Sequence, residues 1–413
     1  MDKVTVLLIF LGTVIGATLA IFRMPVRKIE SERNRRIRLG LTPKPRAFSF
    51  DSRRYASIVT DYSDIEYIGT VYMGSQRAPL RFVLDTGSAD FWAPDISCGI
   101  CDYYCHGLPA SFCHKLCDKG CCSIENHFTE SKCYNKRTFN GAKSTTYRQY
   151  DGTWRIKYGA GMAAGFRGLD KIDLGGMNFD VVFGQATILD TVIASNKNFD
   201  GILGLAFQSI SVDNTLPPFL AAVEQKVINE SIFTVFLRKA GQPVLANGGV
   251  YTFGAFDNVN CEGEINYVHL SSATYFQFVL QKFSFGPTQM GSTHVQVISD
   301  TGTSFIGAPA DVFTMIIKAI GATKDPYGVV VPCNHGEFPN MTLTINGHDY
   351  TLTSHHYIVQ TNTNRCELAM FSMNSIGLGP AWILGDPFIR AYCNVHDMKN
   401  QRIGFARSKE YTP

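Results

Sequence analysis

Two short motifs in the chain carry the same chemical groups in the same order. Asp85-Thr86-Gly87-Ser88 follows an apolar run in the first half, and Asp300-Thr301-Gly302-Thr303-Ser304 follows another in the second half. Each half also holds an apolar pair closed by glycine, Ile202-Leu203-Gly204 and Ile383-Leu384-Gly385. This repetition predicts a duplicated unit whose pseudo-twofold axis brings one carboxylate from each half face to face. Two carboxyl groups placed in this way can activate a water molecule to hydrolyse a peptide bond.

The pairing of the two aspartates gives this chemistry its physical basis. Two carboxyl groups a few ångströms apart cannot both ionise easily, so they share a proton and titrate as one coupled system. The ionised carboxylate takes a proton from the water as it attacks the scissile carbonyl, and the protonated carboxyl polarises that carbonyl. A single Asp-Thr-Gly also makes a good turn, so the second copy is what points to catalysis. The chain shows no Ser/His/Asp or Cys/His arrangement that would indicate a covalent nucleophile.

The first 20 residues predict a secretory signal peptide. Residues 4–20 are apolar and end in small residues, which is typical of a signal peptide that is then removed. A signal anchor is the alternative reading. The remaining composition, with 45% hydrophobic and 18% charged residues over 413 positions, is that of a globular protein with two or three domains or one large bilobed one.

A basic stretch follows the predicted signal peptide. Residues 1–50 hold ten basic and three acidic side chains, and the whole chain carries a formal net charge of +3, which leaves −4 for the remainder. Behind a signal peptide, a nucleic-acid arm or a membrane patch is disfavoured. We therefore expect a basic prosegment over residues 21–55 that covers an acidic cleft and leaves it in acid, with the mature chain starting between Asp51 and Tyr62. Cleavage at Arg53-Arg54 by another protease is the alternative route.

Twelve cysteines, all after residue 97, indicate disulfides in a secreted chain. Cys333 and Cys366 are close enough in sequence for a loop-closing bridge, which leaves Cys261 and Cys393 as the other C-terminal pair. The other eight lie within residues 98–133, where the sequence does not determine their connectivity. They are Cys98, Cys101, Cys105, Cys113, Cys117, Cys121, Cys122 and Cys133.

A zinc site is the alternative reading of this cysteine-rich segment. Cys98 and Cys101, with nearby histidines, have a spacing that zinc ligands also use. The histidines concerned are His106, His114 and His127. An oxidising compartment favours disulfides instead, so we expect no metal ion and no organic cofactor.

From about residue 62 onward, short β-type runs broken by glycine and asparagine predict a largely β structure. Two stretches have helical periodicity, residues 216–228 and residues 309–320, and each comes after one of the two Asp-Thr-Gly motifs. Asn229 and Asn340 begin glycosylation sequons that a secreted chain could use.

Over residues 21–410 the chain resembles the pepsin-like aspartic proteases, and it looks most like nematode digestive or lysosomal members. The prosegment stretch 23–28 is similar to that of cathepsin D-like zymogens. The matching segments are 85–88, Trp92, Tyr158-Gly159, 199–206, 300–304, 382–386 and 403–406. The resemblance implies an all-β, bilobed fold with pseudo-twofold symmetry and a few short helices. It implies an N-terminal lobe over 56–250, with a flap and the insertion 98–133, and a C-terminal lobe over 251–413.

The resemblance also assigns roles to individual residues. Asp85 and Asp300 would be catalytic, and Tyr158-Gly159 would belong to the flap, with Trp92 as the hydrogen-bond partner of Tyr158. Residues that support the catalytic loops would be Thr86, Ser88, Thr301 and Ser304. Residues near the substrate would include Gly87, Gly302, Thr303, Ile298, Phe199 and Ile202.

Two departures from the family pattern bear on function. Ala160 and Met162 stand where family flaps carry hydroxyl residues, so side-chain hydrogen bonds from the flap to substrate should be lost. The insertion 98–133 is larger than the usual small disulfide loop. It is either a disulfide-bonded surface insertion without a binding role or an exosite near the cleft that steers protein substrates or a partner.

The sequence thus predicts a zymogen of an acid endopeptidase that enters the secretory pathway, to be secreted or delivered to a lysosome or gut lumen. We expect a monomer whose partners are protein or peptide substrates and its own prosegment as inhibitor, with no nucleic acid and no stable membrane insertion. The main alternative is a catalytically inactive peptide-binding protein on the same fold, and a disulfide-rich adhesion module explains only the cysteines.

Overall fold

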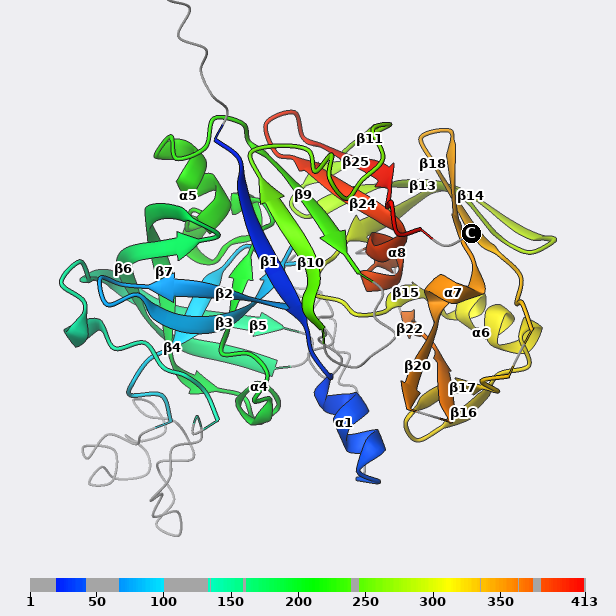
Figure 1. Cartoon of the computed structure of the whole chain (residues 1–413), viewed down its shortest axis with the longest axis horizontal. Helices are drawn as coiled ribbons and strands as arrows, with labels where there is room; N and C mark the ends of the chain where they lie inside the picture. Colours follow the sequence, from blue (N-terminus) through cyan, green and yellow to red (C-terminus); the bar gives the residue numbers. More distant parts are fainter. Residues whose placement is uncertain are drawn as a thin grey trace, which may run out of the picture.

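The computed structural model describes residues 20–41, 67–99, 133, 135–158, 161–238, 245–334, 336–362, 364–373 and 380–411. Strands dominate this part of the chain, and the helices are few and short, which confirms the predicted all-β fold class (Figure 1). The predicted signal peptide, the range expected to contain the mature start and most of the cysteine-rich insertion lie outside the described residues.

The largest sheet extends through both lobes. Its described strands follow one another in the order β11 (Asn266–His269), β25 (Arg402–Arg407), β24 (Tyr392–Asp397), β9 (Ile232–Leu237), β10 (Leu245–Phe253), β1 (Phe22–Lys28), β2 (Tyr67–Met73), β3 (Ala78–Asp85), β8 (Gly201–Gly204), β4 (Phe91–Pro94), β7 (Met177–Leu189), β6 (Gly161–Leu174) and β5 (Arg148–Tyr158). β10 passes through the lobe boundary expected between residues 250 and 251. The two lobes are therefore joined by a continuous sheet at this position.

Two smaller sheets belong to the second half of the chain. One runs β19 (His348–Leu352), β18 (Met341–Ile345), β13 (Phe276–Phe285), β14 (Thr288–Ser299), β23 (Trp382–Leu384), β15 (Ile306–Pro309) and β22 (Met370–Met373), with β12 (Ser272–Ala273) paired to β13. The other runs β16 (Thr323–Asp325), β17 (Gly328–Val331), β21 (Arg365–Leu368) and β20 (Ile358–Asn362). The short helices are α1 (Glu32–Arg38), α4 (Thr191–Ser195), α5 (Pro218–Glu224), α6 (Ala310–Ala319), α7 (Ser354–Tyr357), α8 (Asp386–Ala391), and the 3₁₀ turns η2 (Gly141–Lys143), η3 (Gln208–Ile210) and η4 (Val212–Asn214).

The two predicted helices are present, and one is shorter than expected. α6 closely matches the predicted 309–320 and buries Val312, Phe313 and Ile316 on one face. α5 ends at Glu224, although the apolar pattern continues to Ile228. The chain turns there because Lys226 adopts a left-handed conformation with φ of 58°, which no α-helix allows.

The pairing of strands repeats in the two halves and accounts for the duplicated motifs. In the first half, β8 lies between β3, which leads into Asp85, and β4, which follows the Asp85 loop. In the second half, β23 lies in the same way between β14 and β15, on either side of the Asp300 loop. In both cases the central strand runs parallel to the first and antiparallel to the second. The apolar pairs Ile202-Leu203 and Ile383-Leu384 are these central strands, so they lie between the two strands that flank each aspartate loop.

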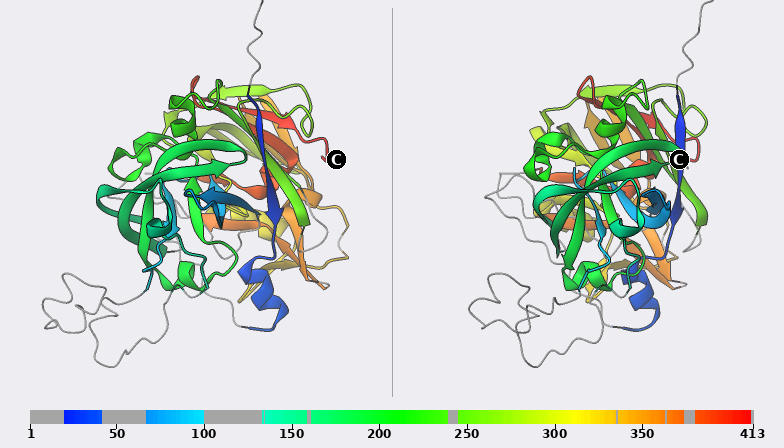
Figure 2. Two further views of the ribbon diagram at one scale, coloured as in Figure 1. Left: turned by 60° about the vertical axis from the view of Figure 1, so that its left-hand side comes forward. Right: turned by 90° about the vertical axis from the view of Figure 1, so that its left-hand side faces the viewer.

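The described part of the predicted prosegment, residues 21–41, is built into the fold. β1 pairs antiparallel with β10 on one side and β2 on the other, and it buries Met24 and Val26 (Figures 1 and 2). At its end, the Nδ2 of Asn198 donates to the carbonyl of Glu30 at 3.0 Å. The helix α1 that follows places Arg33 against the four-stranded sheet of the C-terminal half.

Arg33 is held by several groups and is only 4% exposed. Its guanidinium donates to the carboxylate of Glu367 and to the carbonyl of Tyr327, and it stands 5.7 Å from the centre of the Phe305 ring. The basic segment is thus anchored to both halves of the molecule. A second salt bridge, between Arg38 and Glu30, joins two residues of the same segment, and its arginine side chain is exposed.

Three disulfides lie in the described part of the chain. Cys261 is joined to Cys393 and Cys333 to Cys366, as predicted, with Cα–Cα distances of 6.1 and 5.1 Å. Cys98 is joined to Cys133, which closes the cysteine-rich insertion at its base. Cys98 therefore has no thiolate to offer to a zinc ion. Among the described residues, no helix combines the length and apolar character needed to cross a membrane.

Candidate active site

The two aspartates occupy equivalent loops and are held by equivalent donors. Asp85 Oδ1 accepts from the backbone N–H of Gly87 at 2.9 Å, and its Oδ2 accepts from Ser88 Oγ at 2.5 Å. Asp300 Oδ1 accepts from Gly302 N–H at 2.8 Å, and its Oδ2 accepts from Thr303 Oγ1 at 2.6 Å. Each carboxyl group therefore has one backbone and one hydroxyl donor that fix its orientation, and both aspartates are fully buried.

The glycines after each aspartate leave room for the carboxyl group of the opposite loop. A Cβ atom on Gly87 would stand 2.5 Å from Asp300 Oδ1, and one on Gly302 would stand 2.3 Å from Asp85 Oδ1. Both distances are far inside van der Waals contact. Any side chain at either position would push the two carboxyl groups apart, which explains why both motifs need glycine.

The two threonines cross-link the loops and thus support them, as the family resemblance implied. The backbone N–H of Thr86 donates to Thr301 Oγ1, and that of Thr301 donates to Thr86 Oγ1, both at 3.0 Å. Each hydroxyl then donates to a carbonyl of the opposite half, Thr86 to Ser299 at 3.1 Å and Thr301 to Leu84 at 2.6 Å. Four hydrogen bonds thus fix one loop against the other in a site that excludes water. Ser304, at the end of the second motif, is 5% exposed.

The electrostatics of the pair favour one shared proton. Burial raises the pKa of Asp85, and the hydrogen bonds from Ser88 and Gly87 oppose this rise. Burial also raises the pKa of Asp300, and the negative charge of Asp85 raises it further. Since two adjacent charges in a dry site are costly, one carboxyl stays protonated while the other ionises. This is the protonation state that water activation between two carboxyl groups requires.

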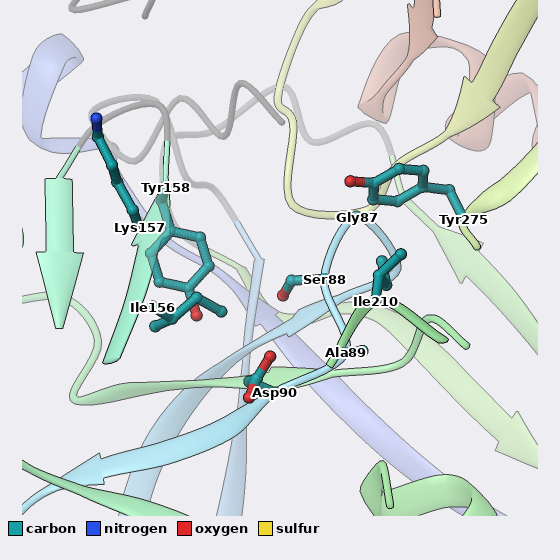
Figure 3. Close-up of a pocket in the computed structure, with 9 residues that line it drawn as sticks. All are labelled: Gly87, Ser88, Ala89, Asp90, Ile156, Lys157, Tyr158, Ile210 and Tyr275. Atoms are coloured by element: carbon teal, nitrogen blue, oxygen red, sulfur yellow. The ribbon is translucent and has the colours of Figure 1, made fainter. Parts of the chain in front are cut away.

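A pocket opens beside the Asp85 loop (Figure 3). The figure shows Tyr158 and Ile156 on one side of the loop that carries Ser88, and Tyr275 and Ile210 on the other. Its lining residues are Gly87, Ser88, Ala89, Asp90, Ile156, Lys157, Tyr158, Ile210 and Tyr275. The pocket is thus formed by both halves of the chain, with apolar walls near the carboxyl groups.

Tyr158, at the end of β5, is fixed as the sequence predicted. Trp92 Nε1 donates to Tyr158 Oη at 2.8 Å, and both side chains are buried. Gly159 and Ala160, which follow Tyr158, lie outside the described residues. Met162, the other departure from the family pattern, stands where β6 begins the return strand, with its sulfur 3.3 Å from a guanidinium nitrogen of Arg155.

Three apolar residues expected near substrate are buried behind the pocket. Phe199 and Ile202 pack with Trp92 in one hydrophobic cluster, and Ile298 packs with Ile383 in another. None of the three is exposed. Ile298 precedes Asp300 by two residues on β14, so its side chain supports the catalytic loop from within the lobe. The apolar side chains that do line the pocket, Ile156, Ile210 and Tyr275, were missed because no local motif marks them.

Asp90 is a third buried carboxyl group at the pocket, and no sequence motif marks it as buried. Its Oδ1 accepts from Trp154 Nε1 and from the backbone N–H of Val212, both at 3.2 Å. Trp154 belongs to β5, the strand that leads to Tyr158, and Val212 belongs to the turn η4. Asp90 therefore links β5 to η4 through hydrogen bonds. Burial raises the pKa of Asp90 to about 6, and the charge of nearby Asp213 adds to the rise.

Asp90→Asn is expected to make the protein more stable at neutral pH relative to acid. The folded-state pKa of Asp90 lies above its unfolded value of 3.8, so this group stabilises the fold below pH 3.8 and loses that contribution as the pH rises through about 6. Asparagine keeps an acceptor for Trp154 and does not titrate. The free energy of unfolding, variant minus parent, should rise by about 3 kcal/mol between acid and neutral pH.

Urea unfolding at several pH values measures this difference. Both proteins would carry Asp300→Asn to prevent self-digestion, and Asp349→Asn, at an exposed side chain, is the matched control with little expected change. If the difference in the free energy of unfolding between variant and parent is the same from pH 3.5 to pH 7, Asp90 does not titrate in this range.

Within the described ranges, no group of three or more histidine, cysteine, aspartate or glutamate side chains could hold a metal ion. The two sequons lie on the surface, with Asn229 and Asn340 both exposed. Both aspartates and all four of their donors are in place, so nothing in the geometry of the dyad favours the inactive peptide-binding alternative.

Comparison with known proteins agrees with this geometry. Residues 66–408 match the model of the family described as eukaryotic aspartyl protease. The chain is 36% identical to Aspartic protease 1 of Caenorhabditis elegans, over 96% of this chain and 97% of that protein. It is 33% identical to Aspartic protease 2 of Necator americanus, over 99% and 100% of the two chains. It is 30% identical to Cathepsin D of Dictyostelium discoideum, over 98% of each.

Proposed function

The chain belongs to the eukaryotic aspartyl protease family and is an aspartic-type endopeptidase, and from this premise we propose that it is made as an acid-activated zymogen with Asp85 and Asp300 as its catalytic pair. The observation that carries the proposal is the facing pair of buried carboxyl groups, each held by a glycine N–H and a hydroxyl. These donors keep both carboxyl groups oriented toward one water molecule, so neither has to reorganise during the reaction.

In the proposed reaction, the dyad begins with one proton and one negative charge. The ionised carboxylate removes a proton from the water while its oxygen attacks the scissile carbonyl, and the protonated carboxyl donates to the carbonyl oxygen. The tetrahedral intermediate collapses when the carboxyl that took the proton of the water passes it to the amide nitrogen and the C–N bond breaks. A hydroxyl proton of the intermediate returns to the other carboxylate as the C=O bond re-forms, so the dyad again holds one proton. No covalent enzyme intermediate forms.

The substrate is proposed to be an extended peptide with apolar side chains beside the cut. Ile156, Ile210 and Tyr275 give the pocket apolar walls from both lobes. Burying an apolar side chain there is favourable by about 25 cal/mol per Å² of surface removed from water. With Ala160 and Met162 in the flap sequence, such burial and backbone hydrogen bonds replace the side-chain hydrogen bonds of other flaps.

The basic segment that includes β1 and α1 is proposed to be the inhibitory prosegment. It is anchored to both lobes, through Asn198 in the first half and through Glu367 in the second. The signal peptide predicted from the sequence, the three disulfides of the described residues and the exposed sequons at Asn229 and Asn340 support a route through the secretory pathway. The mature protease would act outside the cell, in a lysosome or in a gut lumen, as a monomer.

Glu367→Gln is expected to make the proform lose its prosegment at higher pH. In the proposal, acid weakens the pairing between carboxylates and prosegment cations. Glutamine keeps the size of the Glu367 side chain but removes the charge that pairs with Arg33, so this anchor is weaker at every pH. Removing one charge of a buried pair typically costs about 3–5 kcal/mol. We therefore expect the midpoint of prosegment loss to move up by at least about one pH unit.

The pH dependence of prosegment loss is followed on a gel, with cleavage of denatured haemoglobin assayed in parallel. The parent proform should stay intact at pH 7 and become active at about pH 4. Arg38→Ala, which breaks only the exposed pair inside the segment, should leave the midpoint unchanged. If the Glu367→Gln and parent midpoints coincide, the Arg33 anchor does not control release. If folded, prosegment-free protein cuts nothing, the inactive peptide-binding alternative is correct.

A further inference from the structure

The pocket that holds Arg33 is a complete guanidinium site formed by the C-terminal lobe. One wall is the Glu367 carboxylate on β21, the second is the Tyr327 carbonyl in the turn between β16 and β17, and the third is the face of Phe305. A carboxylate, a carbonyl and an aromatic face are the three kinds of group that recognise an arginine side chain. We refer to Glu367, Tyr327, Gly328 and Phe305 as the guanidinium socket.

The socket is held open by residues of the lobe itself. Thr361 Oγ1 donates to Glu367 Oε1 at 3.0 Å, and Arg365 also donates to that oxygen, at 2.5 Å. Arg365 is in turn paired with Asp325 at 2.6 Å, and Asp325 accepts from the backbone N–H groups of Tyr327 and Gly328 at 2.8 Å. Glu367 Oε1 is therefore occupied within the lobe, and Oε2 is the oxygen directed at Arg33.

Gly328 completes the shape of the socket. A Cβ atom at this position would stand 2.5 Å from the Nη2 atom of Arg33 and 3.1 Å from Glu367 Oε2. The space that the guanidinium occupies thus exists because residue 328 has no side chain. The side chain of Glu367 is only 1% exposed while Arg33 is in place. Removing the prosegment leaves a preformed cavity with a carboxylate oxygen and a carbonyl that have lost their donor.

We propose that the mature protease uses this socket to bind an arginine side chain of its peptide substrates, which rests on the proposed removal of the prosegment. The desolvated carboxylate and carbonyl bind more tightly to a ligand that supplies several N–H donors in one plane. Lysine presents a strongly hydrated point charge and cannot donate to both groups while lying flat on the Phe305 ring. The socket should therefore discriminate arginine from lysine.

The socket is within reach of a peptide bound at the catalytic aspartates. Phe305 follows Asp300 by five residues, and a chain of that length spans at most about 18 Å. Phe305 also packs in one hydrophobic cluster with Tyr275 and Ile210, which line the active-site pocket. An extended peptide advances by about 3.3 Å per residue, so the arginine would lie within about six residues of the cut.

The experiment is a digest of a mixed peptide library by enzyme that is first activated in acid and then brought to the highest pH at which it still cuts, so that carboxylate groups can again pair with arginine. Every cleavage site is identified by mass spectrometry. The library is produced with a glutamate-specific protease so that arginine and lysine occur inside the peptides. Arginine should exceed lysine at least about fivefold at one fixed distance from the cut. Glu367→Gln, which removes the charge, and Gly328→Ala, which fills the cavity, should each reduce this ratio toward one. Gly263→Ala, at a glycine with open space around it, is the matched control and should keep the parent ratio.

The outcomes separate this inference from the proposed function. Cleavage without arginine enrichment in the parent enzyme, or enrichment that persists in both variants, would overturn the socket while the protease assignment stands. An enzyme that cuts no peptide after prosegment removal contradicts the proposed function instead. Loss of the enrichment in Glu367→Gln and Gly328→Ala, but not in Gly263→Ala, supports the socket.

Discussion

Replacing Asp300 by asparagine is expected to lower kcat by about 10³- to 10⁴-fold with little change in KM. The amide oxygen can replace Oδ1 and accept from Gly302 N–H, and the amide NH2 can replace Oδ2 and donate to the Thr303 hydroxyl, so the loop should keep its shape. The dyad, however, loses the proton that it shares, and Asp85 then has no partner to polarise the scissile carbonyl. Substrate binding in the apolar pocket does not depend on this proton, which is why the effect should fall on kcat.

The measurement is steady-state cleavage of denatured haemoglobin at acid pH by prosegment-free protein. Asp349→Asn, an exposed carboxyl group on β19, is the control and should keep parental activity. Because Asp300→Asn cannot process itself, its prosegment must be removed by the parent enzyme in trans. Retention of more than about a tenth of the parental kcat would exclude the proposed role of Asp300.

His396→Leu is expected to remove a large acid sensitivity from the stability of the fold. His396 lies on β24, fully buried, with its ring stacked on Phe233 at 4.4 Å and edge-on to Phe276 at 4.4 Å. Burial lowers the pKa of His396 to about 3. Backbone groups of Phe233 and Asn394 offset this only slightly, since neither ring nitrogen makes a hydrogen bond of good geometry.

The lowered pKa of His396 determines how its contribution to stability changes with pH. The folded-state pKa lies below the unfolded value of 6.5, so the neutral ring stabilises the fold above pH 6.5, and that contribution is lost as the pH falls toward 3. The loss is about 1.4 kcal/mol per pH unit, or about 5 kcal/mol in total. Leucine does not titrate, and any packing cost it brings is independent of pH.

Urea unfolding between pH 7 and pH 3, again in an Asp300→Asn background, measures the effect. The stability of His396→Leu relative to the parent should rise by about 5 kcal/mol across this range. His348→Leu, at an exposed position, is the matched control and should run parallel to the parent. Parallel curves for His396→Leu and the parent would mean that the buried ring takes up protons in the folded state as readily as in the unfolded one.

The catalytic loops could be predicted from sequence because their contacts are local or symmetric. Ser88 and Thr303 each lie three residues from the aspartate they bind, and the support of the loops by Thr86 and Thr301 was implied by the family resemblance of the two motifs. Asp90 could not be interpreted in this way. Its partners Trp154 and Val212 lie 64 and 122 residues away, so neither its burial nor its pKa is encoded near it.

The apolar residues expected near the substrate show a second limit of prediction from sequence. An apolar side chain beside a catalytic motif can face the substrate or the interior, and residue type does not distinguish the two. Phe199, Ile202 and Ile298 all face the interior: Ile202 lies on β8, Ile298 lies on β14, and Phe199 lies just before β8. The lobe boundary expected between residues 250 and 251 stays a prediction, and β10 crosses that position within one continuous sheet.

The position of β1 affects the stability of the protein after activation. β1 lies between β10 and β2 in the interior of the largest sheet, so its proposed removal creates two new open edges in the middle of the protein. Open edges accept another strand, either from elsewhere in the same chain or from a neighbouring molecule. A mature chain that unfolds would also lack the strand around which its sheet was first assembled. Activation would then make folding a one-way process, so the lifetime of the mature enzyme would be set by how slowly it unfolds rather than by an equilibrium with the unfolded chain.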